Sequence, residues 1–169
     1  MQIQSRWLFP CEPRHVWPHF LHARMDDNRP LLFRLGVPKP ISCKVLEGVA
    51  AVGNTRQCTT DRGTIDQRIL ILQPDERLRY QMQQSTVWCA DWVGKLVDTF
   101  ELRAVPGQGT EVRRTTQFEA AGSLRWIKQV SLWAGLRQAH AYASRNWRRL
   151  ALQAQASEAQ AAPGSVAAR

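Results

Sequence analysis

The sequence predicts an α+β fold in which an antiparallel sheet of about seven strands is followed by one long C-terminal α-helix. Two patterns support this fold class. Between residues 41 and 120, β-prone runs alternate with short breaks rich in Gly, Pro and Asp. Between residues 123 and 154 there is no proline, and apolar side chains recur every three or four residues. The length of 169 residues fits one domain and is too short for two ordinary ones.

The N-terminal segment predicts one strand followed by short helical turns. Ile3–Phe9 is β-prone, and Pro13 suits the first turn of a helix. Pro18 lacks the backbone N–H that a helix interior needs, so 14–25 is expected to form a broken pair of helical turns. The segment 31–40 is apolar but rich in Gly and Pro, which predicts a loop or a single helical turn.

The middle of the chain predicts a meander of strands. Its breaks at 61–63, 73–76 and 105–108 have the composition of hairpin turns, so consecutive strands are expected to pair antiparallel. The expected strands are 41–47, 54–60, 64–73, 77–84, 91–103 and 109–120.

The final element is predicted to be one amphipathic helix over 123–154, with Gly135 as its only internal weak point. The helical spacing of Trp126, Trp133 and Trp147 indicates core or cavity wall. After this helix the chain is small, polar and interrupted by Pro and Gly. We therefore expect a domain over 1–155 and a disordered tail over 156–169.

The net charge of +9 allows an anionic partner, but the basic residues are spread along the chain without a Lys/Arg tract, a distribution that does not favour nucleic-acid binding. The sequence has no apolar run long enough to span a bilayer, and its first residues lack a secretory signal, so we expect a cytoplasmic protein. Its four cysteines form no C-x-x-C pair and are interpreted as reduced thiols.

No phosphate-binding glycine motif and no G-x-S-x-G elbow is present, so nucleotide and serine-hydrolase chemistry have no visible site. His15, His19 and His22 have the spacing of one helical stripe, but Pro18 disturbs that helix and no Cys or carboxylate completes a zinc motif. We interpret them as a solvated face and expect neither a metal nor a cofactor.

The order of these elements resembles the START-like helix-grip superfamily, also called SRPBCC, over residues 3 to 152. That superfamily includes the birch pollen allergen, lipid-transfer START domains and polyketide cyclase/dehydrase-like proteins. The segments that carry the resemblance are 13–17, 53–56, 63–69, 75–80, 109–112 and 146–150. The resemblance implies a curved sheet wrapped around the long helix, with an apolar ligand cavity between them. Many members carry Glu immediately before an Arg-Ile pair, whereas this chain has Gln67 before Arg68 and Ile69.

Strand periodicity predicts which side chains face that cavity. Asp98 shares a face with the apolar residues of its strand, and Arg114 and Thr116 share a face with Val112 and Phe118. A tight hairpin at 105–108 then sets Asp98 opposite Arg114, or opposite Thr116 if the register shifts by two. By the same alternation, the even positions 78–84 and the odd positions 65–71 face inward. The predicted ligand-binding residues are Gln67, Ile69, Tyr80, Met82, Trp92, Leu96, Asp98, Phe100, Arg114, Thr116, Trp133, Leu136, Arg137 and His140.

These residues support three hypotheses. The first is binding or transport of a hydrophobic or amphipathic small molecule, such as a lipid, isoprenoid or aromatic, polyketide-like compound. The second is a cyclase/dehydratase-like enzyme whose catalytic candidates are Asp98, Arg114, Tyr80 and His140. The third is an adaptor that binds an acidic partner through its basic surface. Asp98 and Arg114 as a purely structural ion pair, a cavity filled by aromatic side chains, and a monomer or a homodimer all stay open.

Overall fold

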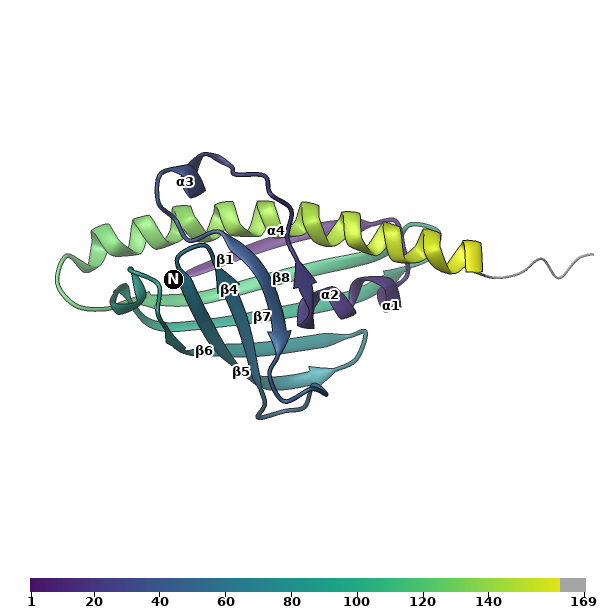
Figure 1. Ribbon diagram of the computed structural model, residues 1–169, viewed down its shortest axis with the longest axis horizontal. Helices are drawn as coiled ribbons and strands as arrows, with labels where there is room; N and C mark the ends of the chain where they lie inside the picture. The colour runs from purple at the N-terminus through teal and green to yellow at the C-terminus, as the bar shows by residue number, and fades with distance from the viewer. Residues whose placement is uncertain (162–169) are drawn as a thin grey trace, which may run out of the picture.

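A computed structural model describes residues 1–161 and shows one curved antiparallel sheet packed against a long helix (Figure 1). The helix runs across the concave side of the sheet. The sheet contains 8 strands in the order β1-β8-β7-β6-β5-β4-β3-β2, so the first strand pairs with the last. The strands are β1 Gln2–Phe9, β2 Ala23–Arg24, β3 Pro40–Val45, β4 Thr55–Thr60, β5 Gly63–Gln73, β6 Arg77–Ser85, β7 Val93–Val105 and β8 Gly109–Ala120. All of the strands predicted from the sequence are present, and the two-residue β2 is additional.

The predicted helices follow the predicted order, and a 3-10 turn replaces the start of the strand predicted over 91–103. The helical elements are α1 Pro13–Val16, α2 Pro18–Leu21, α3 Leu31–Arg34, the 3-10 turn η1 Ala90–Trp92, and α4 Arg125–Ala161. Pro18 separates α1 from α2 because it has no N–H to donate and instead occupies the first position of a new helical turn. Helix α4 continues through Ala161, so residues 156–161, expected in a disordered tail, are helical. The rest of that predicted tail, 162–169, lies outside the described residues.

Two β-bulges between β5 and β6 change the predicted facing of side chains. Gln83 is an extra residue in β6, so Gln84, predicted to face inward, is exposed. Leu70 is an extra residue in β5, so Leu72 rather than Ile71 packs against the core. Each bulge reverses the alternation beyond it, which is why strict parity was wrong at these two positions.

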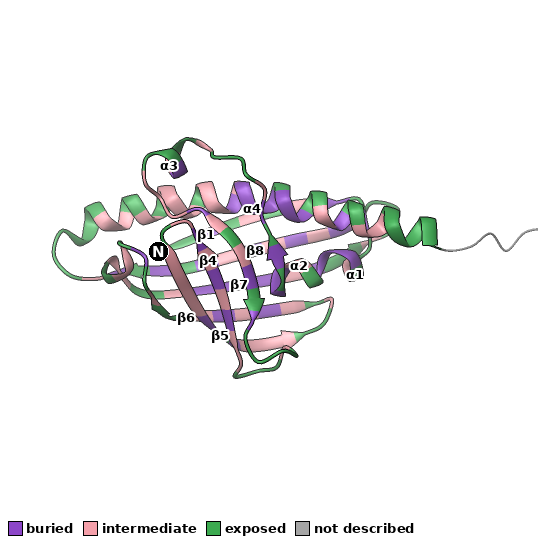
Figure 2. Cartoon of the chain, viewed as in Figure 1, coloured by how far each residue is buried: buried purple, intermediate pink, exposed green. Residues whose placement is uncertain are grey.

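The aromatic core lies under the second half of α4. Phe20 of α2 stacks on Phe100 of β7 with ring centroids 4.7 Å apart, and the edge of Trp147 meets both rings at 5.0 and 5.4 Å. All the buried residues of α4 lie between His140 and Ala151. Figure 2 shows the same change along the helix, from exposed and intermediate turns to buried ones.

The first half of α4 is more exposed than its sequence predicts. Trp126 and Trp133, expected in the core or cavity wall, are 72% and 37% exposed. Neither ring lines the cavity described below, and the Trp133 ring instead lies 5.1 Å from the Arg137 guanidinium. The apolar period of α4 is the same at Trp126 and Trp133 as in the buried turns that follow. It does not predict their exposure, because exposure depends on which other elements pack against each half of the helix.

Two of the cysteines are joined, in contrast to the prediction of four reduced thiols. Cys43 of β3 lies directly opposite Cys58 of β4 and forms a disulfide with it. The sequence did not indicate this bond, because the two residues are 15 positions apart and belong to no motif. The pairing of β3 with β4 places them opposite each other. Cys11 and Cys89 are free.

Candidate functional site

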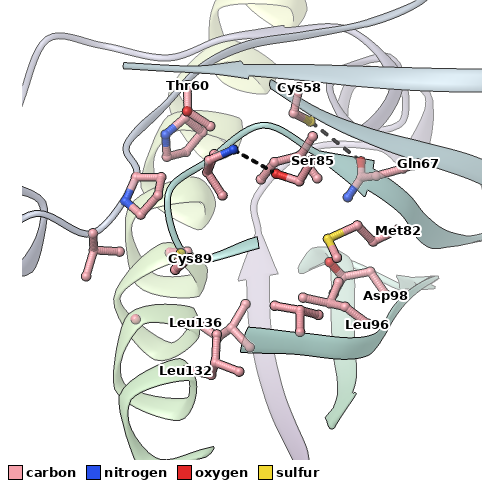
Figure 3. Close-up of a pocket in the computed structure, with 18 of the residues that line it drawn as sticks. Cys58, Thr60, Gln67, Met82, Ser85, Cys89, Leu96, Asp98, Leu132 and Leu136 are labelled. Carbon is pink, nitrogen blue, oxygen red and sulfur yellow. Dashed lines mark hydrogen bonds between the residues drawn. The ribbon is translucent and has the colours of Figure 1, made fainter. Parts of the chain in front are cut away.

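A cavity of about 380 Å³ lies between the sheet and the first half of α4. This volume is within the range of about 300–1,000 Å³ that is typical of small-molecule sites. Strands β3 to β8 and loop residues such as Val37 and Trp88 supply one part of the wall. Helix α4 supplies the other part, and Figure 3 shows its Leu132 and Leu136 facing the strand that carries Leu96. Apolar side chains dominate the lining.

Eight of the predicted ligand-binding residues line this cavity. They come from separate strands, from η1 and from α4, and are Gln67, Tyr80, Met82, Trp92, Leu96, Asp98, Arg114 and Leu136. Figure 3 shows Gln67, Met82 and Asp98 on the same side of the cavity. Alternation was sufficient to find the six positions that lie on strands, because the extra residues Leu70 and Gln83 come after Gln67 in β5 and after Met82 in β6.

Six predicted residues do not line the cavity. Ile69 and Phe100 are fully buried in the aromatic and aliphatic core. Thr116 and His140 are buried behind the cavity wall, with 0% and 1% exposure. The remaining two, Trp133 and Arg137, are exposed residues of α4. Four of the six are therefore buried without lining the cavity, and the other two lie at the surface.

Asp98 and Arg114 form a buried ion pair in the cavity wall. Arg114 donates from Nε to Oδ1 at 3.0 Å and from Nη2 to Oδ2 at 2.8 Å, a bidentate geometry. The residue directly opposite Asp98 is Thr116, so the hairpin adopts the second of the two predicted registers, and Arg114 reaches Asp98 diagonally. Arg114 also lies over the rings of Phe100 and Trp147, at 5.2 and 5.7 Å.

A chain of hydrogen bonds connects this pair to β1. The ionised Asp98 can only accept, so the Thr116 hydroxyl donates to it and must accept from His140 Nε2, 2.7 Å away. His140 Nδ1 then accepts from the Ser5 hydroxyl at 2.9 Å. These bonds place a proton on Nε2 of His140, and with Nδ1 as the acceptor from Ser5 the imidazole is the neutral Nε2–H tautomer.

Burial and charge move the pKa values of this network away from neutrality. Burial, together with the nearby charge of Arg114, lowers the pKa of His140 to about 3. Burial alone would raise the pKa of Asp98, but the charge and hydrogen bonds of Arg114 outweigh it and hold that pKa below its usual value. Burial and then Asp98 raise the pKa of Tyr80 to about 12. At neutral pH the network therefore contains an ion pair and a neutral imidazole, and the phenol of Tyr80 in the cavity wall is neutral as well.

Arg56 is a cavity residue that the sequence reasoning missed. It is 2% exposed, lines the cavity from β4, and places its guanidinium 4.9 Å from the centre of the Tyr80 ring. Its Nη1 donates to the Gln67 side-chain oxygen and to Cys58 Sγ. A signal for Arg56 was available, since Arg56, Cys58 and Thr60 share one face of a predicted strand and all line the cavity.

The three histidines near the N-terminus do not form the continuous solvated stripe that their spacing predicts. His15 is buried in α1 and its Nε2 lies 3.4 Å from Glu158, whereas His22 is exposed beyond α2. Within residues 1–161, no group of three His, Cys, Asp or Glu side chains is placed to hold a metal ion. Over the same residues, no helix has the length and apolar character needed to cross a bilayer.

Several solved structures are similar to this chain. Ara h 8.0201 aligns with a TM-score of 0.65 at 15% identity, over 90% of this chain and 98% of its own. The Zhui aromatase/cyclase from Streptomyces sp. R1128 aligns with a TM-score of 0.64 at 13% identity, over 92% and 93% of the two chains. Protein NE0264 from Nitrosomonas europaea has a TM-score of 0.64 at 13% identity, over 92% and 97%.

The sequence by itself gives no such match, since no protein-family model and no curated protein matches it. The structural likeness at this low identity concerns the fold, and it agrees with the sheet order, the two short helices after β1 and the long final helix. The chain therefore has the helix-grip fold, as the resemblance seen in the sequence predicts.

Proposed function

We propose that this protein binds or carries a hydrophobic or amphipathic small molecule, of the size of a lipid fragment, an isoprenoid or an aromatic polyketide-like compound, in the cavity between the sheet and α4. The observation that carries the proposal is the cavity itself, about 380 Å³ in volume and lined mainly by apolar side chains. A pocket of this kind takes apolar ligands and orients them with a few polar groups. Asp98, Arg114, Arg56, Gln67 and Tyr80 are those polar groups.

The alternative is a cyclase/dehydratase-like enzyme that acts on such a molecule, and the name of one structural neighbour, an aromatase/cyclase, favours it. Proton transfer is most efficient for groups that titrate near the working pH. Asp98 and Tyr80 titrate far from neutrality, and His140 does not line the cavity. These features support binding over catalysis.

Blocking the cavity tests the proposal. Ala139 lines the cavity from α4, so Ala139→Phe places a ring in the ligand's space, whereas Ala156→Phe adds the same ring to an exposed turn of the same helix. With the neutral fluorescent probe 1-aminoanthracene, we expect wild type and Ala156→Phe to bind equally and Ala139→Phe to bind about tenfold more weakly or not at all. Equal binding by all three proteins would place the probe elsewhere and contradict the proposal.

A further inference from the structure

The charges in the cavity wall do not balance. Three charged side chains line it, namely Arg56, Asp98 and Arg114. Asp98 and Arg114 compensate each other in their bidentate pair. Arg56 takes part in none of the ion pairs formed among residues 1–161. Burial raises the pKa of the Cys89 thiol, so that group adds no negative charge. The wall therefore carries one uncompensated positive charge.

The partners that Arg56 does have are all neutral. They are the amide oxygen of Gln67, the sulfur of Cys58 and the ring face of Tyr80. Its Nε is buried and has no hydrogen-bond partner. A guanidinium that is 2% exposed has lost nearly all of its hydration, and neutral contacts replace only part of it. The nearby charge of Arg114 adds repulsion, which the charge of Asp98 offsets only in part. The site thus lacks a counter-ion for Arg56.

We infer that the natural occupant of the cavity is an amphipathic carboxylic acid whose carboxylate pairs with Arg56 while its apolar body fills the remaining space. This inference rests on the proposed binding function and adds the chemical class of the ligand. A carboxylate is planar and offers two oxygens to the flat guanidinium, the same match that Asp98 makes with Arg114. Asp98 and Arg114 are already paired with each other, so the lining offers no second free charge to a second charged group on the ligand.

The neutral side chain of Gln67 leaves Arg56 without an internal counter-ion, and the preference for an acidic ligand depends on it. The Gln67 side-chain oxygen already accepts from Arg56 Nη1, so a glutamate at this position would have an oxygen at the same place and bring a negative charge with it. Gln67→Glu is nearly isosteric, and it would give Arg56 an internal counter-ion. The variant should then reject an acidic ligand, since the wall would be neutral and the ligand's carboxylate would face the introduced one at close range.

The test compares 4-phenylbutanoic acid with 4-phenylbutan-1-ol, which share one apolar body and differ in the head group. Both are titrated at pH 8 as competitors of bound 1-aminoanthracene. We expect the wild type to prefer the acid by about 10- to 100-fold, the ratio that a buried charge-assisted contact provides.

Gln67→Glu should lose this preference and keep its affinity for the alcohol. Gln117→Glu adds the same charge to an exposed position of β8 and should retain the preference. Arg56→Met should remove the preference without affecting the alcohol.

The outcomes separate the two proposals. If the wild type binds both compounds equally, or if Gln67→Glu retains the preference for the acid, the inference about Arg56 is wrong while the cavity still functions. If 1-aminoanthracene does not bind to the wild type, the proposed function fails and the inference fails with it. A purely structural role for Arg56 and Gln67 would change the affinity for acid and alcohol by the same factor, which also contradicts the inference.

Discussion

Replacing Asp98 by Asn is expected to lower the free energy of unfolding by about 3–5 kcal/mol, because it leaves the buried Arg114 guanidinium without its counter-charge. Arg114→Met should cost a similar amount, since Asp98 would then be buried with only the Thr116 hydroxyl as a close partner. The double variant Asp98→Asn with Arg114→Met removes both charges and should be much closer to wild type than the sum of the single effects. Urea unfolding at pH 7 measures all three.

Arg113→Met is the matched control for this series. Arg113 precedes Arg114 on β8, but its side chain points to the other face and is 38% exposed. Its replacement should change the free energy of unfolding by less than about 0.5 kcal/mol. Single variants at Asp98 and Arg114 that cost less than about 1 kcal/mol each, with additive effects in the double variant, would show that the pair is not the buried unit described above.

His140 is expected to make the protein sensitive to mild acid. Its pKa is about 3 in the folded protein and about 6.5 in an unfolded chain, so below pH 6.5 the unfolded state binds a proton that the folded state does not. The contribution of His140 to the free energy of unfolding is therefore fully present above pH 6.5 and is lost as the pH decreases toward 3. At pH 4.5 the protonation of this group in the unfolded state should have lowered the free energy of unfolding by about 2–3 kcal/mol.

His140→Gln isolates this contribution. Glutamine can still donate to Thr116, but it does not titrate, so the other ionisable groups give the same pH dependence in both proteins. The difference in unfolding free energy between wild type and variant, measured in urea at intervals from pH 8 to pH 4.5, should change by about 2–3 kcal/mol in favour of the variant. A difference that is independent of pH would contradict the assigned neutral, buried imidazole.

The facing of the side chains on β7 and β8 was predictable because local rules are sufficient there, although two registers stayed open. A tight hairpin joins two strands with regular alternation, so parity places Asp98, Arg114 and Thr116 on one face. The same rules failed at Gln84 and Ile71, where a single extra residue in one strand reverses the pattern. A bulge of this kind leaves little trace in composition, because it depends on how two strands fit together.

The difference between the two halves of α4 has another origin. Trp126 and Trp147 have the same helical face pattern, yet one is exposed and the other is buried against Phe20 and Phe100. The amphipathic period identifies an apolar stripe but not what packs against it, and among the described residues Trp126 has no such aromatic partners and does not line the cavity. Alternation places Arg56 on one face with Cys58 and Thr60, but an arginine on a strand is normally exposed, so this signal did not predict its burial.

Native mass spectrometry of the freshly purified protein, followed by denaturing extraction, tests the central claim that the cavity holds a ligand. We predict one amphipathic small molecule per chain in the wild type and its absence from Ala139→Phe, in which the ring occupies the cavity. An extracted carboxylic acid would agree with the charge of Arg56, and a neutral molecule would contradict that inference alone. A wild-type protein that is empty as purified and also fails to bind 1-aminoanthracene would contradict the account of the cavity as a binding site.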